Sequence, residues 1–114
     1  MERLERIETI NELLDIYGML LTRRQWEALS ACYQEDLTLA EIAEITGGTR
    51  QAAHDLIRRG EHQLQHYEEQ LHVLSAQQQR RSLLEQLKEL LLELPLGEEQ
   101  RSRADALLEA LYSI

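Results

Sequence analysis

The chain has 114 residues and a formal net charge of −9 at pH 7, so it suits one domain and leaves little room for a second independent core. It holds one proline and no phenylalanine, and 43% of its residues are hydrophobic, a composition that favours packed helices over strands. The charge disfavours tight binding to a polyanion, because lysine and arginine supply most of the affinity for phosphate. We predict an all-α protein.

The negative charge is concentrated at the two ends of the sequence. The net charge is −4 over residues 1–36, −1 over 37–67 and −4 over 68–114. The lone Cys32 excludes an intrachain disulfide, and we expect it to pack as a small hydrophobic residue. The first residues lack a signal-peptide pattern, and no apolar run approaches the ~20 residues of a membrane span. We expect a soluble, cytoplasmic protein without membrane contact.

Two helices are predicted before the centre of the chain. Apolar residues at steps of three and four predict a first helix that ends near Gly18 to Leu21. Thr22 is expected to cap a second helix, which carries Trp26 at helical spacing and ends near Gln34. The apolar face of the first helix comprises Leu4, Ile7, Ile10, Leu13, Leu14, Tyr17 and Leu21.

A helix-turn-helix is predicted between Thr38 and Arg59. Thr38 stands three residues before Glu41, the spacing of a capping box. Gly47 and Gly48 are expected to supply positive φ for a sharp turn, and Thr49 to cap the next helix. A short helix, a glycine turn and a capped helix form the helix-turn-helix arrangement. Small or apolar residues stand at the expected inner positions, which are Ala43, Ala53, Leu56 and Ile57.

The last part of the chain is predicted to form longer helices. The helix after the turn is expected to continue to Leu74, with a break in the glutamine-rich residues 76–81. A leucine-rich fifth helix should stop at Pro95, and a sixth should run from Glu98 and bury Ala104, Leu107, Leu108 and Leu111. We therefore expect residues 1–79 to contain the N-terminal helices, the helix-turn-helix and a long fourth helix. Residues 80–114 should form a helical hairpin that packs on the same core or across a homodimer.

The outward face of the second motif helix is the candidate site. Its residues would meet base edges and phosphates in a nucleic-acid complex, and they are Arg50, Gln51, His54, Arg58 and Arg59. Arg23 and Arg24 are candidates for further phosphate contacts. The alternative is that these arginines pair with nearby glutamates on a solvated surface. Three to five phosphate contacts would give only weak DNA or RNA binding.

The titratable residues predict no catalytic or metal centre. His62 and His66 lie one helical turn apart but lack a third ligand. His54 and Asp55 point about 100° apart on a helix, and no serine or cysteine nucleophile accompanies them. We predict a protein that is not an enzyme and needs no metal or cofactor.

The central residues TLAEIAEITGGTRQAAHDLIRR carry a resemblance that covers about residues 8–75. They resemble the YlxM family, small helix-turn-helix proteins similar to region 4 of sigma-70 factors and usually encoded beside the signal recognition particle GTPases. The most telling run is TRQAAHDLIRR, close to the family's Ser-Arg-Gln-Ala-Val-Tyr-Asp-Asn-Ile-Arg-Arg. Gly48, Ala53 and His54 depart from the family, which tends to have a β-branched apolar residue, valine and tyrosine there.

The resemblance implies a sigma-70 region 4-like fold with extended C-terminal helices. It also implies a regulatory or accessory role in the signal recognition particle pathway, through the particle's GTPase or its RNA. Two alternatives stay open. One is a transcription regulator that reads the major groove through Arg50, Gln51 and His54, and the other is a purely protein-binding helical adaptor.

Overall fold

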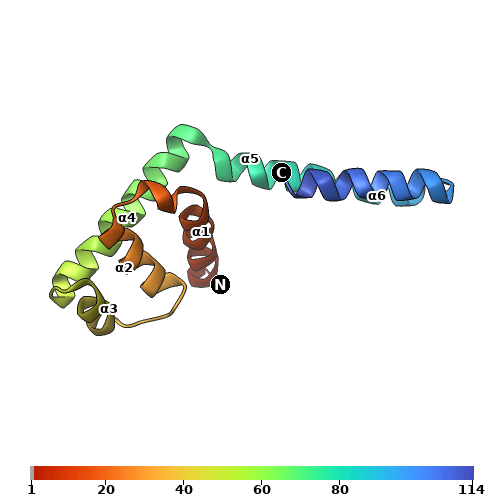
Figure 1. Cartoon of the computed structure of the whole chain (residues 1–114). Coiled ribbons are helices and arrows are strands. Elements are labelled where there is room, and N and C mark those ends of the chain that lie inside the picture. The colour runs from red at the N-terminus through yellow and green to blue at the C-terminus, as the bar shows by residue number, and fades with distance from the viewer. Residues whose placement is uncertain (1) are drawn as a thin grey trace. The chain divides into compact units, whose positions relative to one another are not determined.

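The computed structural model describes residues 2–114 and confirms the all-α prediction. Six α-helices and one short 3-10 helix follow one another, and the described residues contain no strand (Figure 1). The helices group into two compact units, one up to Leu74 and one over Ser75–Ile114. None of the helices over residues 2–114 combines the length and the apolar content needed to cross a bilayer.

The first unit opens with two helices whose ends match the predicted caps. α1 spans Glu2–Tyr17, the 3-10 helix η1 spans Gly18–Leu20, and α2 spans Arg23–Tyr33. The Thr22 hydroxyl accepts a hydrogen bond from the Gln25 N–H, and the Gln25 side chain accepts one from the Thr22 N–H. This reciprocal capping satisfies two otherwise unpaired donors and fixes the start of α2.

The helix-turn-helix consists of α3, Leu39–Thr46, and α4, Arg50–Leu71. The capping box of Thr38 and Glu41 forms as predicted, and its hydrogen bonds lower the pKa of the Glu41 carboxyl. Gly47 is left-handed with φ 77°. The same expectation for Gly48 was wrong. Gly47 is the only glycine with positive φ among the residues that the structure describes, so one left-handed residue completes the turn. Thr49 caps α4 by accepting a hydrogen bond from the Ala52 N–H.

The four helices of the first unit enclose one core. α4 packs against each of the other three, and Tyr17, Leu29, Ile42 and Leu64 are the largest fully buried side chains. Gly60 is buried where α4 meets α2, and a Cβ atom there would lie only 2.6 Å from Leu29 Cδ1. Gly60 therefore permits a close helix crossing.

The predicted break at residues 76–81 was wrong, because these residues lie inside α5, Val73–Glu93. The chain instead turns at His72, which is left-handed with φ 53°. Two side chains accept hydrogen bonds from the backbone N–H groups just beyond the turn. The Glu68 carboxylate accepts hydrogen bonds from the Tyr17 hydroxyl and the Leu74 N–H, and the Tyr17 hydroxyl accepts one from the Val73 N–H.

The second unit is a helical hairpin of α5 and α6, Glu98–Tyr112, joined at Pro95–Gly97. The Arg101 guanidinium donates a hydrogen bond to the Leu94 carbonyl and secures the turn. Leu84 and Leu108 are buried, as expected for Leu108. The expected burial of Leu107 and Leu111 was wrong, because they are 67% and 40% exposed.

Candidate nucleic-acid interface

The N-terminal half of α4 presents all the predicted contact residues to solvent. Ala53 and Ile57 are buried against the core, which fixes the rotation of the helix about its axis. The opposite side is consequently outward-facing. Gln51, His54, Arg58 and Arg59 are exposed there, and Arg50 is exposed as the first residue of the helix, beyond the buried positions.

The three arginines of this face stand apart from the polar contacts recorded over residues 2–114. Among residues 2–114, Arg50, Arg58 and Arg59 form no hydrogen bond and no ion pair. The alternative in which they pair with glutamates is therefore not the arrangement adopted. Unpaired guanidinium groups on a fixed helix are suited to phosphate, which they can bind with charge-assisted hydrogen bonds.

The remaining polar residues of this face interact with one another. Gln51 Nε2 donates a hydrogen bond to Asp55 Oδ1 at 3.3 Å, and His54 Nδ1 lies 3.9 Å from the same oxygen. Asp55 therefore lowers the positive charge of the face and holds Gln51 along the helix. A base edge that recruits Gln51 must first replace the Asp55 contact.

Arg23 and Arg24 differ from the arginines of α4. Arg23 Nε pairs with Glu27 at 3.0 Å within α2. Arg24 donates to the Thr46 carbonyl at 3.2 Å, so it ties α2 to the end of α3 beside the glycine turn. Both side chains are exposed, but each already has a partner within the protein. They are therefore not part of the candidate site.

A hollow of about 640 Å³ beside α4 extends the basic face onto α1. His54, Arg58 and His62 line it from α4, and Arg3 lines it from α1. Arg3 was missed by the sequence reasoning, because its proximity to Arg58 arises only when α1 packs on α4. Asp36 also lines the hollow, so its charge is mixed.

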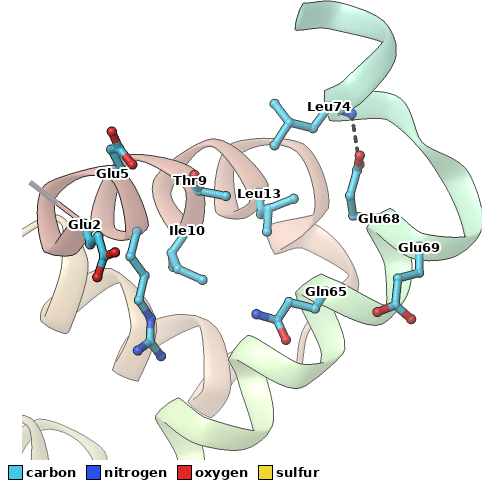
Figure 2. A pocket seen from close by; sticks show the side chains of 10 residues that line it. Glu2, Glu5, Thr9, Ile10, Leu13, Gln65, Glu68, Glu69 and Leu74 are labelled. Atoms are coloured by element: carbon cyan, nitrogen blue, oxygen red, sulfur yellow. Dashed lines mark hydrogen bonds between the residues drawn. The ribbon is translucent and has the colours of Figure 1, made fainter.

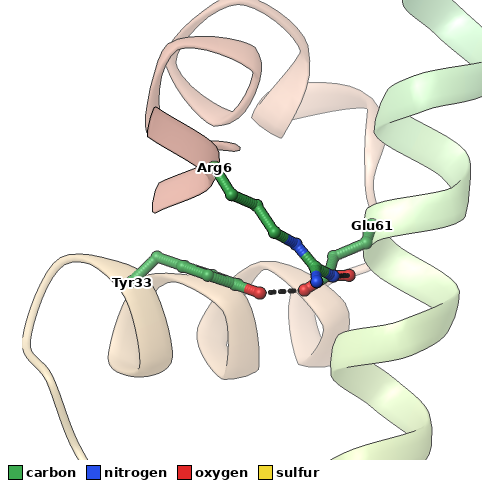
Figure 3. A network of polar contacts seen from close by, with 3 residues as sticks. All are labelled: Arg6, Tyr33 and Glu61. Carbon is green, nitrogen blue, oxygen red and sulfur yellow. Dashed lines mark hydrogen bonds and ion pairs between the residues drawn. The ribbon is translucent and has the colours of Figure 1, made fainter. Parts of the chain in front are cut away.

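A polar network that joins α1, α2 and α4 lines part of the same hollow (Figure 3). The buried Glu61 carboxylate accepts hydrogen bonds from the Tyr33 hydroxyl and, at 2.9 Å, from Arg6. Burial of the Tyr33 hydroxyl and its hydrogen bond to Glu61 raise the pKa of Tyr33. The hydrogen bond from Arg6 to Glu61 raises the pKa of Arg6. Because its charge is compensated, Glu61 does not cancel the basic rim. The sequence offered no signal for this network beyond the residue types.

A second hollow, of about 480 Å³, lies between α1 and α4 and has the opposite charge (Figure 2). Ile10, Leu13 and Leu74 supply its apolar part, and Glu2, Glu5 and Glu69 are acidic residues at its edge. Carboxylates repel phosphate, so this region is unsuited to nucleic acid. The basic residues of the candidate site therefore lie on the N-terminal half of α4 and the adjoining start of α1.

The other singled-out residues form no metal centre. His62 and His66 are exposed, and the described residues contain no group of three or more ligating side chains suited to a metal ion. Cys32 is half-buried, and burial raises the pKa of its thiol, which makes it a poor nucleophile.

Comparisons with known proteins agree with this geometry. The family model described as "Putative helix-turn-helix protein, YlxM / p13 like" matches residues 4–104. The chain belongs to this family. YlxM of Bacillus subtilis is 40% identical over 111 residues, which cover 97% of each chain. A relative from Symbiobacterium thermophilum is 45% identical over 104 residues, covering 91% of this chain and 97% of that relative.

Membership of the YlxM/p13-like family confirms the resemblance inferred from the central residues. It extends the match beyond the motif, because residues 4–104 include all of α5 and the first part of α6. The family description names a helix-turn-helix protein, which agrees with the arrangement of α3 and α4.

Proposed function

We propose that this protein binds the phosphate backbone of a nucleic acid through the N-terminal half of α4. The observation that carries the proposal is the set of three exposed and unpaired arginines, Arg50, Arg58 and Arg59. Their helix is held by the buried Ala53 and Ile57, so binding requires little rearrangement. A preorganised basic surface loses less conformational entropy on binding than a mobile one.

We further propose that the ligand is the RNA of the signal recognition particle, and that the protein is a regulatory or accessory factor of that pathway. This step rests on what the family resemblance implies about the pathway. The basic face supports RNA as the component bound, in preference to the particle's GTPase. Backbone contacts suit a folded RNA, because arginine recognises phosphate geometry without reading a base sequence.

The affinity should be modest and sensitive to salt. With three to five phosphate contacts, the logarithm of the binding constant should fall with the logarithm of the salt concentration. The slope should be about −3 to −5 on duplex DNA and somewhat shallower on single strands. The net charge of −9 creates a long-range field that opposes the approach of a polyanion. We expect dissociation constants in the micromolar range at physiological salt.

A transcription regulator that reads DNA is the second candidate function. The placement of Arg50 and Gln51 in the first turn of α4 favours it, because the start of a recognition helix commonly reaches base edges in the major groove. The Gln51 to Asp55 hydrogen bond weighs against it, since it engages one of the two N–H donors that Gln51 could offer to adenine.

Fluorescence anisotropy with two labelled probes, the particle's RNA and a random-sequence duplex DNA, tests the proposal. We expect salt-sensitive binding with preference for the RNA. If Arg50→Ala and Gln51→Ala change the ranking among DNA sequences, the DNA reader is correct instead. If neither probe binds, but the protein co-elutes with the particle's GTPase, nucleic-acid binding is refuted and the adaptor function is supported.

A further inference from the structure

The hollow between α1 and α4, here called the acidic hollow, has the features of a second binding site. Its volume of about 480 Å³ is in the range of pockets that hold a ligand. The apolar floor comprises Ile10 and Leu13 of α1 and Leu74 at the start of α5 (Figure 2). All the residues that line it belong to the first unit. The three floor residues are part of the buried core, so the floor is formed before any ligand binds.

Acidic side chains flank this floor on both sides. Glu2 and Glu5 of α1 lie on one wall and Glu69 of α4 lies on the other, and all three are exposed. None of these glutamates forms a hydrogen bond or an ion pair with another residue of 2–114. Carboxylates on both walls favour a ligand that carries positive charge on both sides of an apolar centre.

The other two charged residues of the acidic hollow are already engaged. Arg6 pairs with the buried Glu61 at 2.9 Å, so its positive charge is compensated. The Glu68 carboxylate accepts hydrogen bonds from the Tyr17 hydroxyl and the Leu74 N–H, so it holds the floor in place. The opening of the hollow therefore keeps a negative charge.

The length of the acidic hollow suits a short helix. Its lining extends from Glu2 to Leu13 along α1, a rise of about 16 Å or three helical turns. A helix satisfies its own backbone hydrogen bonds, whereas an extended peptide gains affinity by pairing with a strand edge, and the described residues contain no strand. Nucleic acid, anionic lipid and a second copy of this chain, with its net charge of −9, are all disfavoured by charge repulsion.

We propose that the acidic hollow binds an amphipathic helix of a partner protein, with apolar residues at helical spacing and lysine or arginine on both flanks. The apolar residues would contact Ile10, Leu13 and Leu74, and the cations would pair with the glutamates of the two walls. The acidic hollow shares only Arg6 with the hollow beside Arg58, so this helix and a nucleic acid would occupy different parts of the first unit. The inference goes beyond the proposed function and does not depend on it.

Fluorescence anisotropy on the full chain tests the proposal with a labelled model peptide of ~14 residues, or about four helical turns. Leucines at positions i, i+3, i+4 and i+7 form its apolar face, and lysines flank them. In one control peptide glutamates replace the lysines, and in the other the same residues are scrambled so that no apolar face forms. We expect micromolar binding, at least about tenfold tighter than that of either control. Absence of binding by the lysine peptide, or equal affinity for either control, overturns the proposal.

A matched pair of substitutions locates the contact. Gln65 and Gln63 are both exposed residues of α4 that point about 160° apart, and only Gln65 lines the acidic hollow. Gln65→Arg should weaken binding of the lysine peptide by about fivefold or more, whereas Gln63→Arg should change it by less than about twofold. Equal effects of the two arginine substitutions overturn the placement of the helix in the acidic hollow.

The reverse change of charge keeps the test decisive if an arginine variant does not fold, which circular dichroism shows. Gln65→Glu adds a carboxylate beside Glu69 and should tighten binding of the lysine peptide by about twofold or more. Gln63→Glu is its control and should leave the affinity nearly unchanged. If Gln65→Glu binds the peptide no more tightly than Gln63→Glu does, the proposal is wrong.

Discussion

The replacement of Gly60 by alanine sets two opposing effects against each other. Alanine stabilises a helix interior by about 1 kcal/mol relative to glycine. Gly60 has an ordinary helical φ, so the backbone accepts a side chain. However, the new Cβ would lie 2.6 Å from Leu29 Cδ1 and 3.2 Å from Leu29 Cγ.

The packing effect should be larger than the propensity effect. Leu29 is fully buried and cannot swing into solvent, and overpacking of a core typically costs about 1–3 kcal/mol. We therefore expect Gly60→Ala to lower the free energy of unfolding by about 1–2 kcal/mol. For a unit of this size each kcal/mol corresponds to roughly 4–8 °C in the melting temperature.

Urea denaturation followed by tryptophan fluorescence measures this change in the first unit, because Trp26 in α2 is the only tryptophan. In a Leu29→Ala background the clash is removed, so Gly60→Ala should there become stabilising by up to about 1 kcal/mol. Gly48→Ala is the control outside the core, since its Cβ would lie 3.2 Å from Ala52 Cβ and 3.9 Å from Arg24 Nη2 and would touch no buried leucine. If Gly60→Ala increases the stability of the otherwise wild-type protein, the close crossing of α4 and α2 at Gly60 is contradicted.

Three further predictions concern the polar contacts. Glu61→Ala should destabilise the protein by about 1–3 kcal/mol because the Tyr33 hydroxyl loses its acceptor, whereas Arg6→Ala should cost less than about 1 kcal/mol because the Arg6 side chain is 66% exposed. Chemical denaturation of both variants checks this order, and equal losses would contradict it. Tyr17→Phe should speed hydrogen exchange at the Val73 and Leu74 amides, because Tyr17 and Glu68 hold the start of α5 by hydrogen bonds. The exchange rates of the α3 amides should stay unchanged, and a uniform acceleration would indicate a global effect instead. The lowered pKa of Glu41, below its ordinary 4.5, means that its capping contribution is present above about pH 4.5 and is lost as pH falls through the folded-state value. The stability difference between wild type and Glu41→Gln should therefore shrink on acidification, and a constant difference would contradict this assignment.

Local signals in the sequence sufficed to predict the elements that local contacts determine. Thr22, Thr38 and Thr49 cap helices through residues within three positions, and Gly47 adopts a left-handed conformation that glycine accommodates without steric cost. Such interactions depend on neighbouring residues and hardly on the fold. The outward orientation of Gln51 and Arg58 was predictable for the same reason, because helical periodicity sets it once the apolar side is known.

Other features depend on residues distant in the sequence. His72 turns the chain where the Tyr17 hydroxyl donates a hydrogen bond to the Glu68 carboxylate and accepts one from the Val73 N–H, contacts that span 51 and 56 positions. The glutamine-rich segment gave a misleading local signal. No local signal marks Gly60 as the position of a close helix crossing, because its partner, Leu29, belongs to another helix. Likewise, Arg3 joins the hollow beside Arg58 only through the packing of α1 on α4.

The most direct test of the account is the salt dependence of RNA binding by wild-type protein and two single-charge variants. Arg58→Ala removes an unpaired arginine from the face of α4, and Lys88→Ala removes one positive charge from α5 in the second unit. We predict that Arg58→Ala weakens binding and makes the logarithmic salt slope shallower by about 0.7–0.9, whereas Lys88→Ala leaves the slope unchanged. Equal slopes for all three proteins would contradict the assignment of phosphate contacts to α4.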